Sequence, residues 1–230
     1  MEKTVVRLSE VRNKGAWNFS LFSAENRKAE AALKQSPYPV VPLKEIVKKA
    51  ERGFSIRPES SSEGIPLLSV QCITPKGVVI DNANRFISQE EHQKLYRSAV
   101  KRNDVLVSLL RHPNVNISAV YESDEPANLT SALVRLQLEK EKIDPRYLST
   151  FLNSSVGQSL IQQRTIGSIQ QSMTISRLLD LPIPLPPLEE QEHLLRAIQD
   201  KHSEAIKYEQ EAIKLREEAN ELIGNLFKNE

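Results

Sequence analysis

The sequence predicts an α+β fold of short, mostly antiparallel strands and helices, followed by one long C-terminal coiled-coil helix. Two observations carry this prediction. Between residues 40 and 165, short apolar runs rich in β-branched residues alternate with turn signals and capped helical segments. Residues 188–230 contain no proline and a single glycine, Gly224. Such a segment predicts a helix about 60 Å long, which is longer than a small domain is wide.

Residues 1–36 are expected to form an N-terminal arm. Residues 4–11 suit a strand or a lead-in, and residues 23–35 suit a helix with Ser23 as its N-cap. The prolines of residues 36–39 end this helix. The pattern leaves open whether the arm packs on the following domain or on a partner.

Residues 37–187 are expected to form the α+β domain. Its first half predicts a helix over 43–49, a turn at Arg52-Gly53, a strand over 65–73 and a turn at 74–77 before a return strand. Ser88 and Glu91 form a capping-box pattern for a helix reaching Ala99. The remaining elements are strands at 104–110, 117–121 and 132–138, and helices at 145–152 and 155–165.

Residues 188–230 carry apolar side chains at coiled-coil spacing. Pro187 suits a first helical turn, and the glutamates that follow it complement the helix dipole. Lys201 interrupts an otherwise apolar seam. A long helix buried in the same domain remains the alternative, but polar residues on the opposite side favour a coiled coil. The predicted dimerisation residues are Leu194, Ile198, Ala205, Tyr208, Ala212, Leu215, Ala219, Leu222 and Leu226.

Charge divides unevenly between these parts. The whole chain has a net charge of +1, but residues 189–230 hold 6 basic and 11 acidic residues, giving −5. Residues 1–188 therefore hold 25 and 19, giving +6. This asymmetry favours a DNA-binding unit joined to a protein-binding helix, although an ordinary charged surface also explains it. The sequence has no membrane-length apolar run, no signal-peptide pattern and one cysteine, so a cytoplasmic protein is expected.

The sequence offers no candidate catalytic residue and no metal site. No two of the 7 glycines lie two residues apart, which excludes glycine-rich phosphate loops. Leu185 and Leu188 flank the Pro-Pro pair, so it lacks the Asp/Asn-Pro-Pro-aromatic pattern of adenine methyltransferases. The 4 histidines show no metal-ligand spacing. We therefore expect a protein that is not an enzyme.

Side chains suited to reading DNA base edges gather in three segments. The alternative for each segment is a solvated surface loop. The candidate DNA-binding residues are Arg52, Ser55 and Arg57 in the first, Arg111, His112, Asn114 and Asn116 in the second, and Arg164, Ser168, Gln170, Gln171 and Ser172 in the third.

Three stretches carry a resemblance to a known family: Arg102–Val107, Ile143–Leu148 and Gly167–Gln191. Together they resemble the specificity subunit of type I restriction-modification enzymes. That family has two target-recognition domains joined by two long helices, so this chain resembles one half. The resemblance implies binding to a bipartite double-stranded DNA target together with a DNA adenine methyltransferase subunit and a restriction or motor subunit.

The resemblance also implies that S-adenosylmethionine, ATP and magnesium belong to those partner subunits, with no cofactor on this chain. A homodimer through the C-terminal helix would supply two recognition domains. Two other functions stay open from sequence: a coiled-coil protein-binding adaptor, and a detached recognition domain of a fused methyltransferase-nuclease.

Overall fold

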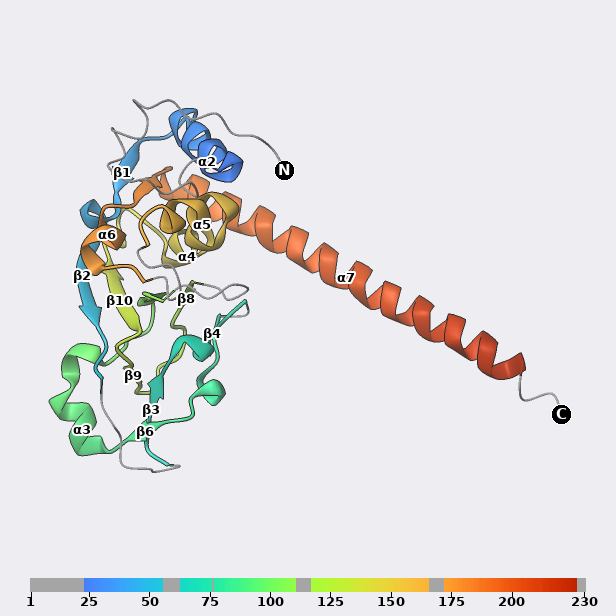
Figure 1. The fold of residues 1–230 in the computed structure, drawn as a ribbon, viewed down its shortest axis with the longest axis horizontal. Coiled ribbons are helices and arrows are strands. Elements are labelled where there is room, and N and C mark those ends of the chain that lie inside the picture. Colours follow the sequence, from blue (N-terminus) through green and yellow to red (C-terminus); the bar gives the residue numbers. More distant parts are fainter. Residues whose placement is uncertain (1–22, 56–62, 76, 111–116, 166–171, 227–230) are drawn as a thin grey trace. The chain divides into compact units, whose positions relative to one another are not determined.

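The computed structural model describes residues 23–55, 63–75, 77–110, 117–165 and 172–226. The chain forms two compact units, residues 1–188 and residues 189–230. The first is a mixed α+β unit with mainly antiparallel strand pairs, and the second is helical (Figure 1). The predicted fold class is confirmed. The candidate strand at 4–11 lies outside the described residues.

A four-stranded antiparallel sheet forms the centre of the first unit, in the order β2-β10-β7-β8. Three predicted strands are confirmed as β7 (Val105–Ser108), β8 (Ser118–Val120) and β10 (Leu133–Leu138). In the centre of the sheet, Leu136 lies opposite Ala50 on one side and Val105 on the other. Most side chains of β7 and β10 are buried, as their β-branched, apolar sequences lead one to expect.

The fourth strand, β2 (Val47–Arg52), corrects the prediction of a helix over 43–49. Only a single 3-10 turn, η2 (Leu43–Glu45), forms there. The stretch contains lysine, alanine and glutamate, which favour helices locally, but pairing with β10 supplies its backbone with hydrogen bonds from 80 and more residues away in the chain. The strand therefore depends on a non-local contact that local pattern does not contain.

Gly53 continues β2 in place of the predicted turn. Its N–H donates to the Leu133 carbonyl at 3.0 Å. A Cβ at this position would lie 2.2 Å from the carbonyl oxygen of Leu129 and 2.3 Å from that of Thr130. Glycine is required at this position because the neighbouring backbone lies too close to leave room for a Cβ.

We expect Gly53→Ala to lower the free energy of unfolding by about 1–3 kcal/mol, because the added methyl group meets backbone atoms that cannot turn aside. Urea denaturation followed by circular dichroism measures this. Ser55→Ala, two residues on at an exposed position, is the control and should change stability little. Equal stability of the two variants would contradict the packing described at Gly53.

A second group of strands packs beside the main sheet. β3 (Ile65–Leu68) pairs antiparallel with β6 (Phe86–Ile87) and parallel with β9 (Asn128–Leu129), while β4 (Ile73–Thr74) pairs with β5 (Gly77–Val78). The strand predicted over 65–73 is therefore interrupted. The 3-10 helix η3 (Val70–Cys72) turns there and buries the Cys72 thiol in the shared core, and a further 3-10 turn, η4 (Ile80–Asn82), follows β5.

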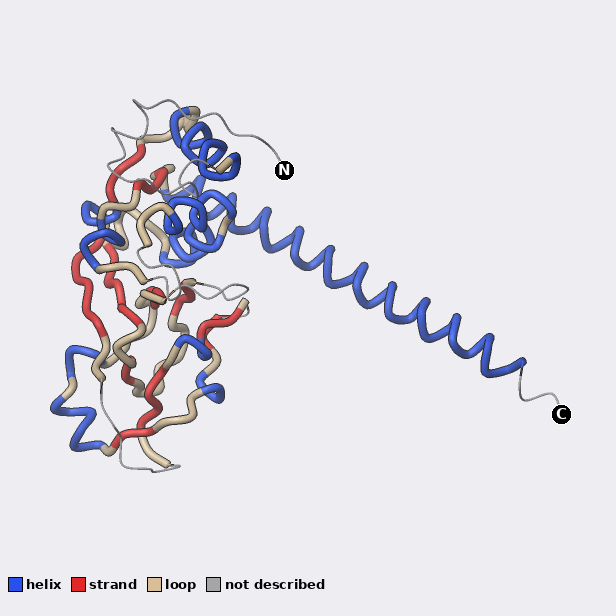
Figure 2. The backbone as a smooth tube through the Cα atoms, in the orientation of Figure 1, coloured by secondary structure: helices blue, strands red, loops and turns tan. Residues whose placement is uncertain are grey.

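The described α-helices of the first unit are α2 (Ala24–Lys34), α3 (Gln89–Lys94), α4 (Pro145–Asn153), α5 (Ser155–Gln162) and α6 (Ile175–Leu179). The helices α2 and α3 begin at the predicted caps, Ser23 and Ser88. Ser23 accepts from the Asn26 N–H, and Ser88 and Glu91 form the capping box. α3 is shorter than predicted, because the 3-10 helix η5 (Tyr96–Ser98) replaces its last turn. α2 packs on α5, and α2, α4 and α5 lie at one end of the first unit with α3 at the other (Figures 1 and 2).

The first unit closes with a two-stranded pairing between β1 (Val40–Pro42) and β11 (Pro182–Pro184). The Tyr147 hydroxyl on α4 donates to the Pro184 carbonyl at 2.8 Å, and burial raises the pKa of Tyr147 to about 12. The hydroxyl therefore stays protonated at neutral pH and keeps donating this bond. β11 is followed by the Pro186-Pro187 pair, after which α7 (Leu188–Leu226) begins.

The long helix is present as α7 (Leu188–Leu226), 39 residues. At about 1.5 Å per residue it extends about 58 Å. In the unit formed by residues 189–230, Tyr208, Leu215 and Leu222 are 62%, 58% and 71% exposed. Among the described helices, none has the length and apolarity to cross a membrane.

Candidate nucleic-acid interface

Segments that lie far apart in the sequence meet at one end of the main sheet. Because β2 and β7 both run antiparallel to β10, their C-terminal ends flank its N-terminal end. Arg52 lies opposite Val134, and Ser108 lies opposite Leu133. The Leu109 N–H continues this contact and donates to the Ala132 carbonyl at 2.8 Å. We call this end of the sheet, with Arg52–Ser55, Thr130–Leu133, Ser108–Leu110 and Ile117–Ser118, the sheet-end surface.

The third predicted segment joins the sheet-end surface through Ser172. Leu110 and Ser172 form an antiparallel bridge, and the Met173 N–H donates to the Leu109 carbonyl at 2.9 Å. One described end of each predicted DNA-binding segment therefore lies at this surface, whereas Arg164 of the third segment contacts α5 and the end of α6. This supports treating the three segments as one site.

The predicted site residues in the described part of the chain differ in what they contact. Arg52 is exposed, and its Nε donates to the Ser131 carbonyl at 2.6 Å, which holds β2 against the start of β10. Ser55 and Ser172 are exposed to solvent. The other predicted residues, apart from Arg164, lie outside the described residues: Arg57, Arg111, His112, Asn114, Asn116, Ser168, Gln170 and Gln171.

Arg164 is half-buried and its guanidinium is engaged with the backbone. It donates to the Leu160 carbonyl and to the Asp180 carbonyl, each at 3.3 Å. Burial lowers the pKa of Arg164, which still leaves it fully charged at neutral pH. Its carbonyl in turn accepts from Arg177 at 3.2 Å. These contacts tie α5 to α6, so Arg164 holds the segment in place.

Asn153, at the end of α4, fixes the start of β8, and sequence reasoning missed it. Its Oδ1 accepts from the N–H groups of Ile117 and Ser118 at 3.0 and 3.2 Å, and its Nδ2 donates to the Ser118 carbonyl at 2.8 Å. The only sequence signal was an asparagine at a helix C-terminus, which also suits an ordinary cap.

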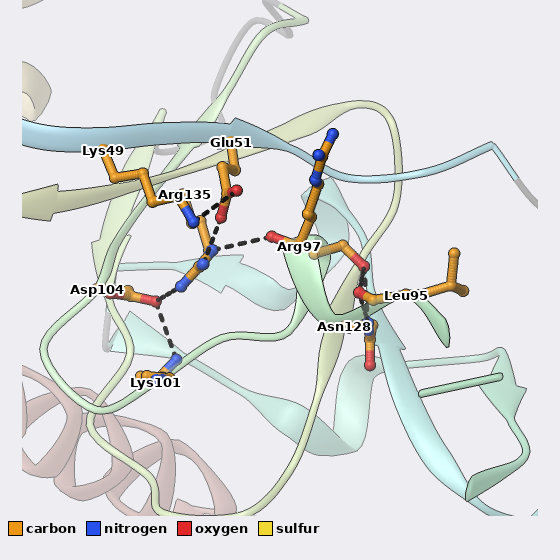
Figure 3. A network of polar contacts seen from close by, with 9 residues as sticks. Lys49, Glu51, Leu95, Arg97, Lys101, Asp104, Asn128 and Arg135 are labelled. Atoms are coloured by element: carbon orange, nitrogen blue, oxygen red, sulfur yellow. Dashed lines mark hydrogen bonds and ion pairs between the residues drawn. The ribbon is translucent and has the colours of Figure 1, made fainter. Parts of the chain in front are cut away.

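A buried ion network lies on one side of the main sheet (Figure 3). Arg135 on β10, 4% exposed, forms ion pairs with Glu51 on β2 and with Asp104 at 2.9 Å. Burial acts to raise the pKa of Glu51, but hydrogen bonds from Lys49 and Arg135 outweigh it and lower that pKa. Glu51 therefore stays ionised at neutral pH, and the network crosslinks strands that form the sheet-end surface.

The same network reaches the turn that follows α3. Arg135 Nε donates to the Arg97 carbonyl at 3.1 Å. Nearby, the buried Asn128 side chain donates to the Leu95 carbonyl at 3.1 Å (Figure 3) and to Ser98 Oγ at 2.7 Å. Its Oδ1 contacts His92. In the described residues, no group of three or more metal-ligating side chains comes together. The buried side chains thus hold the backbone of the turn through the Leu95 and Arg97 carbonyls.

Comparison with known proteins places these features in a family. Residues 35–216 match the type I restriction modification DNA specificity domain. A type I restriction enzyme EcoBI specificity subunit from Escherichia coli is 29% identical over 137 residues, which cover 60% of this chain and 28% of that protein. The MjaVIII specificity subunit from Methanocaldococcus jannaschii is 27% identical over 206 residues, covering 87% and 48%. The chain spans less than half the length of these relatives.

Solved structures share the fold at lower identity. The HsdS subunit from Thermoanaerobacter tengcongensis aligns with a TM-score of 0.51 at 18% identity, over 86% of this chain and 47% of that one. A chain from a structure that describes complex assembly and conformational transition of the type I R-M system aligns with a TM-score of 0.54 at 17% identity. The alignment covers 85% of this chain and 48% of that one. With the family model matching most of its length, the chain belongs to the type I restriction-modification DNA specificity family.

Proposed function

We propose that this chain selects the DNA sequence on which a type I restriction-modification complex acts. The observation that carries the proposal is that one described end of each predicted segment, at Arg52, Leu110 and Ser172, lies at the sheet-end surface. The three segments are rich in Arg, Asn, Gln and Ser by sequence. Such side chains read base edges in the major groove. Membership of the DNA specificity family supports this role, and the basic excess of residues 1–188 favours approach to DNA.

The chemistry belongs to partner subunits in this proposal. The sequence lacks a methyltransferase motif and a glycine-rich phosphate loop, so a modification subunit would supply the methyl transfer and a restriction subunit the cleavage. S-adenosylmethionine, ATP and magnesium would bind those subunits. The chain then acts as a non-catalytic subunit that positions its partners on DNA.

The exposed seam of α7 supports a two-fold arrangement. A stripe of apolar side chains of this length is rarely left in water, and a second copy of the same helix is the simplest cover. Two antiparallel copies would carry two identical recognition units and read inverted half-sites separated by unread base pairs. A helix of about 58 Å, at about 3.4 Å per base pair, limits that separation to about 17 base pairs.

DNA binding measured at several salt concentrations tests the proposal. We expect the chain with its modification subunit to bind duplex DNA with an affinity that falls steeply with salt, because phosphate contacts release counterions. The same chain without that subunit should transfer no methyl group from S-adenosylmethionine. Absence of salt-dependent DNA binding would contradict the proposal and favour a coiled-coil adaptor.

A further inference from the structure

Tyr96 and Arg97 form an exposed pair that the predicted DNA segments do not include. In the described part of residues 1–188, Tyr96 is the most exposed large apolar side chain, at 64%. The Arg97 guanidinium carbon lies 5.9 Å from the centre of its ring. Nearby, Lys94 and Arg102 are paired with Glu90 and Asp124, whereas Arg97 forms no ion pair within the described residues. The pair therefore presents an aromatic face beside a cation that no carboxylate of the described residues pairs with.

The backbone that carries this pair is held from below by buried groups. Arg135 and Asn128, which are 4% and 0% exposed, donate to the carbonyls on either side of Tyr96, those of Arg97 and Leu95. The Arg97 side chain points away from the Arg135 guanidinium (Figure 3). Burying a charged side chain carries a large desolvation cost. The hydrogen bonds from Arg135 and Asn128 nevertheless fix the surface turn in position, and a fixed position is what a binding element requires.

The turn lies next to the sheet-end surface. η5 packs against β2, and Arg135 links the Arg97 carbonyl to Glu51, the residue before Arg52. Arg52 in turn holds the start of β10 through the Ser131 carbonyl. The turn and the sheet-end surface are thus parts of one continuous hydrogen-bonded framework.

We infer that Tyr96 and Arg97 are a second contact to duplex DNA, in which Arg97 binds a backbone phosphate and Tyr96 packs against the adjoining sugar. The inference rests on the proposed function and extends it to residues outside the three loop segments. A cation that forms no ion pair within the described residues favours an anionic partner, and a phosphate fits the guanidinium geometry. Such a contact sets the register of the protein on DNA and does not read sequence.

Binding by Arg97→Ala and Tyr96→Ala variants, in complex with the modification subunit, tests the inference. The probes are a duplex holding the target found by methylation mapping and a mixed-sequence duplex of equal length. Arg97→Ala should weaken binding to both by about eightfold at 0.1 M salt and flatten the salt slope by about 0.9. Tyr96→Ala should weaken binding about two- to tenfold with the slope unchanged.

Arg146→Ala is the matched control, because it removes the same charge at the start of α4, beyond the opposite end of β10. It should bind like the wild type. Arg97→Gln, which keeps most of the side-chain stem, replaces Arg97→Ala if thermal melting shows the latter to be unfolded. Tyr96→Phe should retain the contact.

Two results overturn the inference while leaving the proposed function in place. In one, the wild type binds DNA and both variants match it in affinity and salt slope. In the other, both variants bind DNA normally but no longer co-purify with the modification subunit, which would assign the pair to a protein contact. Absence of DNA binding by the wild type is a different outcome, because it contradicts the proposed function itself.

Discussion

Arg135→Ala is expected to lower the free energy of unfolding by about 3–5 kcal/mol, since it leaves the buried Asp104 carboxylate without its counter-charge and Glu51 paired only with Lys49 among the described residues. The side chains of Glu51 and Asp104 are 13% and 5% exposed, so water cannot replace the guanidinium. The Arg97 carbonyl loses a donor at the same time. For a domain of typical stability, about 5–15 kcal/mol, this is a large fraction. Urea or thermal unfolding measures the change.

Arg102→Ala is the matched control for this loss. Arg102 makes a two-point contact with Asp124, but the two side chains are 51% and 77% exposed. Its removal should change stability little, because solvent screens an exposed ion pair. Equal stability of the two variants would mean that the Arg135 ion pairs contribute no more than an exposed pair. That result would contradict the proposal that the Arg135 network holds the sheet together.

Replacing Leu215 and Leu222 together by Asp should convert a dimer into a monomer. Both side chains are exposed on α7 and occupy one repeating position of the predicted seam. A carboxylate there would have to be buried in the interface at a cost that no partner offsets. Light scattering at micromolar concentration measures the mass. The double variant should lose binding to the bipartite target while residues 1–188 stay folded.

Ser203→Asp with Gln210→Asp adds the same charge to the opposite side of α7 and is expected to leave the dimer intact. A wild-type chain that is a monomer under these conditions would contradict the homodimer. A DNA target with two unrelated halves would contradict it too, and would indicate a second, different specificity chain as the partner.

Sequence predicted those elements whose signals are local. Ser23, Ser88 with Glu91, and Asp144 cap the expected helices, because a capping side chain bonds residues two or three positions along the chain. β2 was predicted as a helix, because its strand conformation depends on β10. Tertiary pairing decided the structure of a stretch whose composition favoured the other state.

The candidate site was predictable to a lesser extent. Residue type pointed to Arg52 and Ser172, and the strand register then showed that their segments meet. Arg135 was missed, although an arginine inside an apolar strand is itself a signal of a buried ion pair. Its partner Glu51 lies on β2 and its partner Asp104 lies directly before β7, so no spacing rule along the sequence finds them.

Mapping methylated adenines in cells with and without this chain tests the central claim most directly. The account predicts that one split target, with inverted half-sites separated by at most about 17 base pairs, loses methylation when the chain is absent and regains it on re-expression. An identical methylation pattern in both cells, with the partner subunits present, would contradict a role in selecting the DNA sequence.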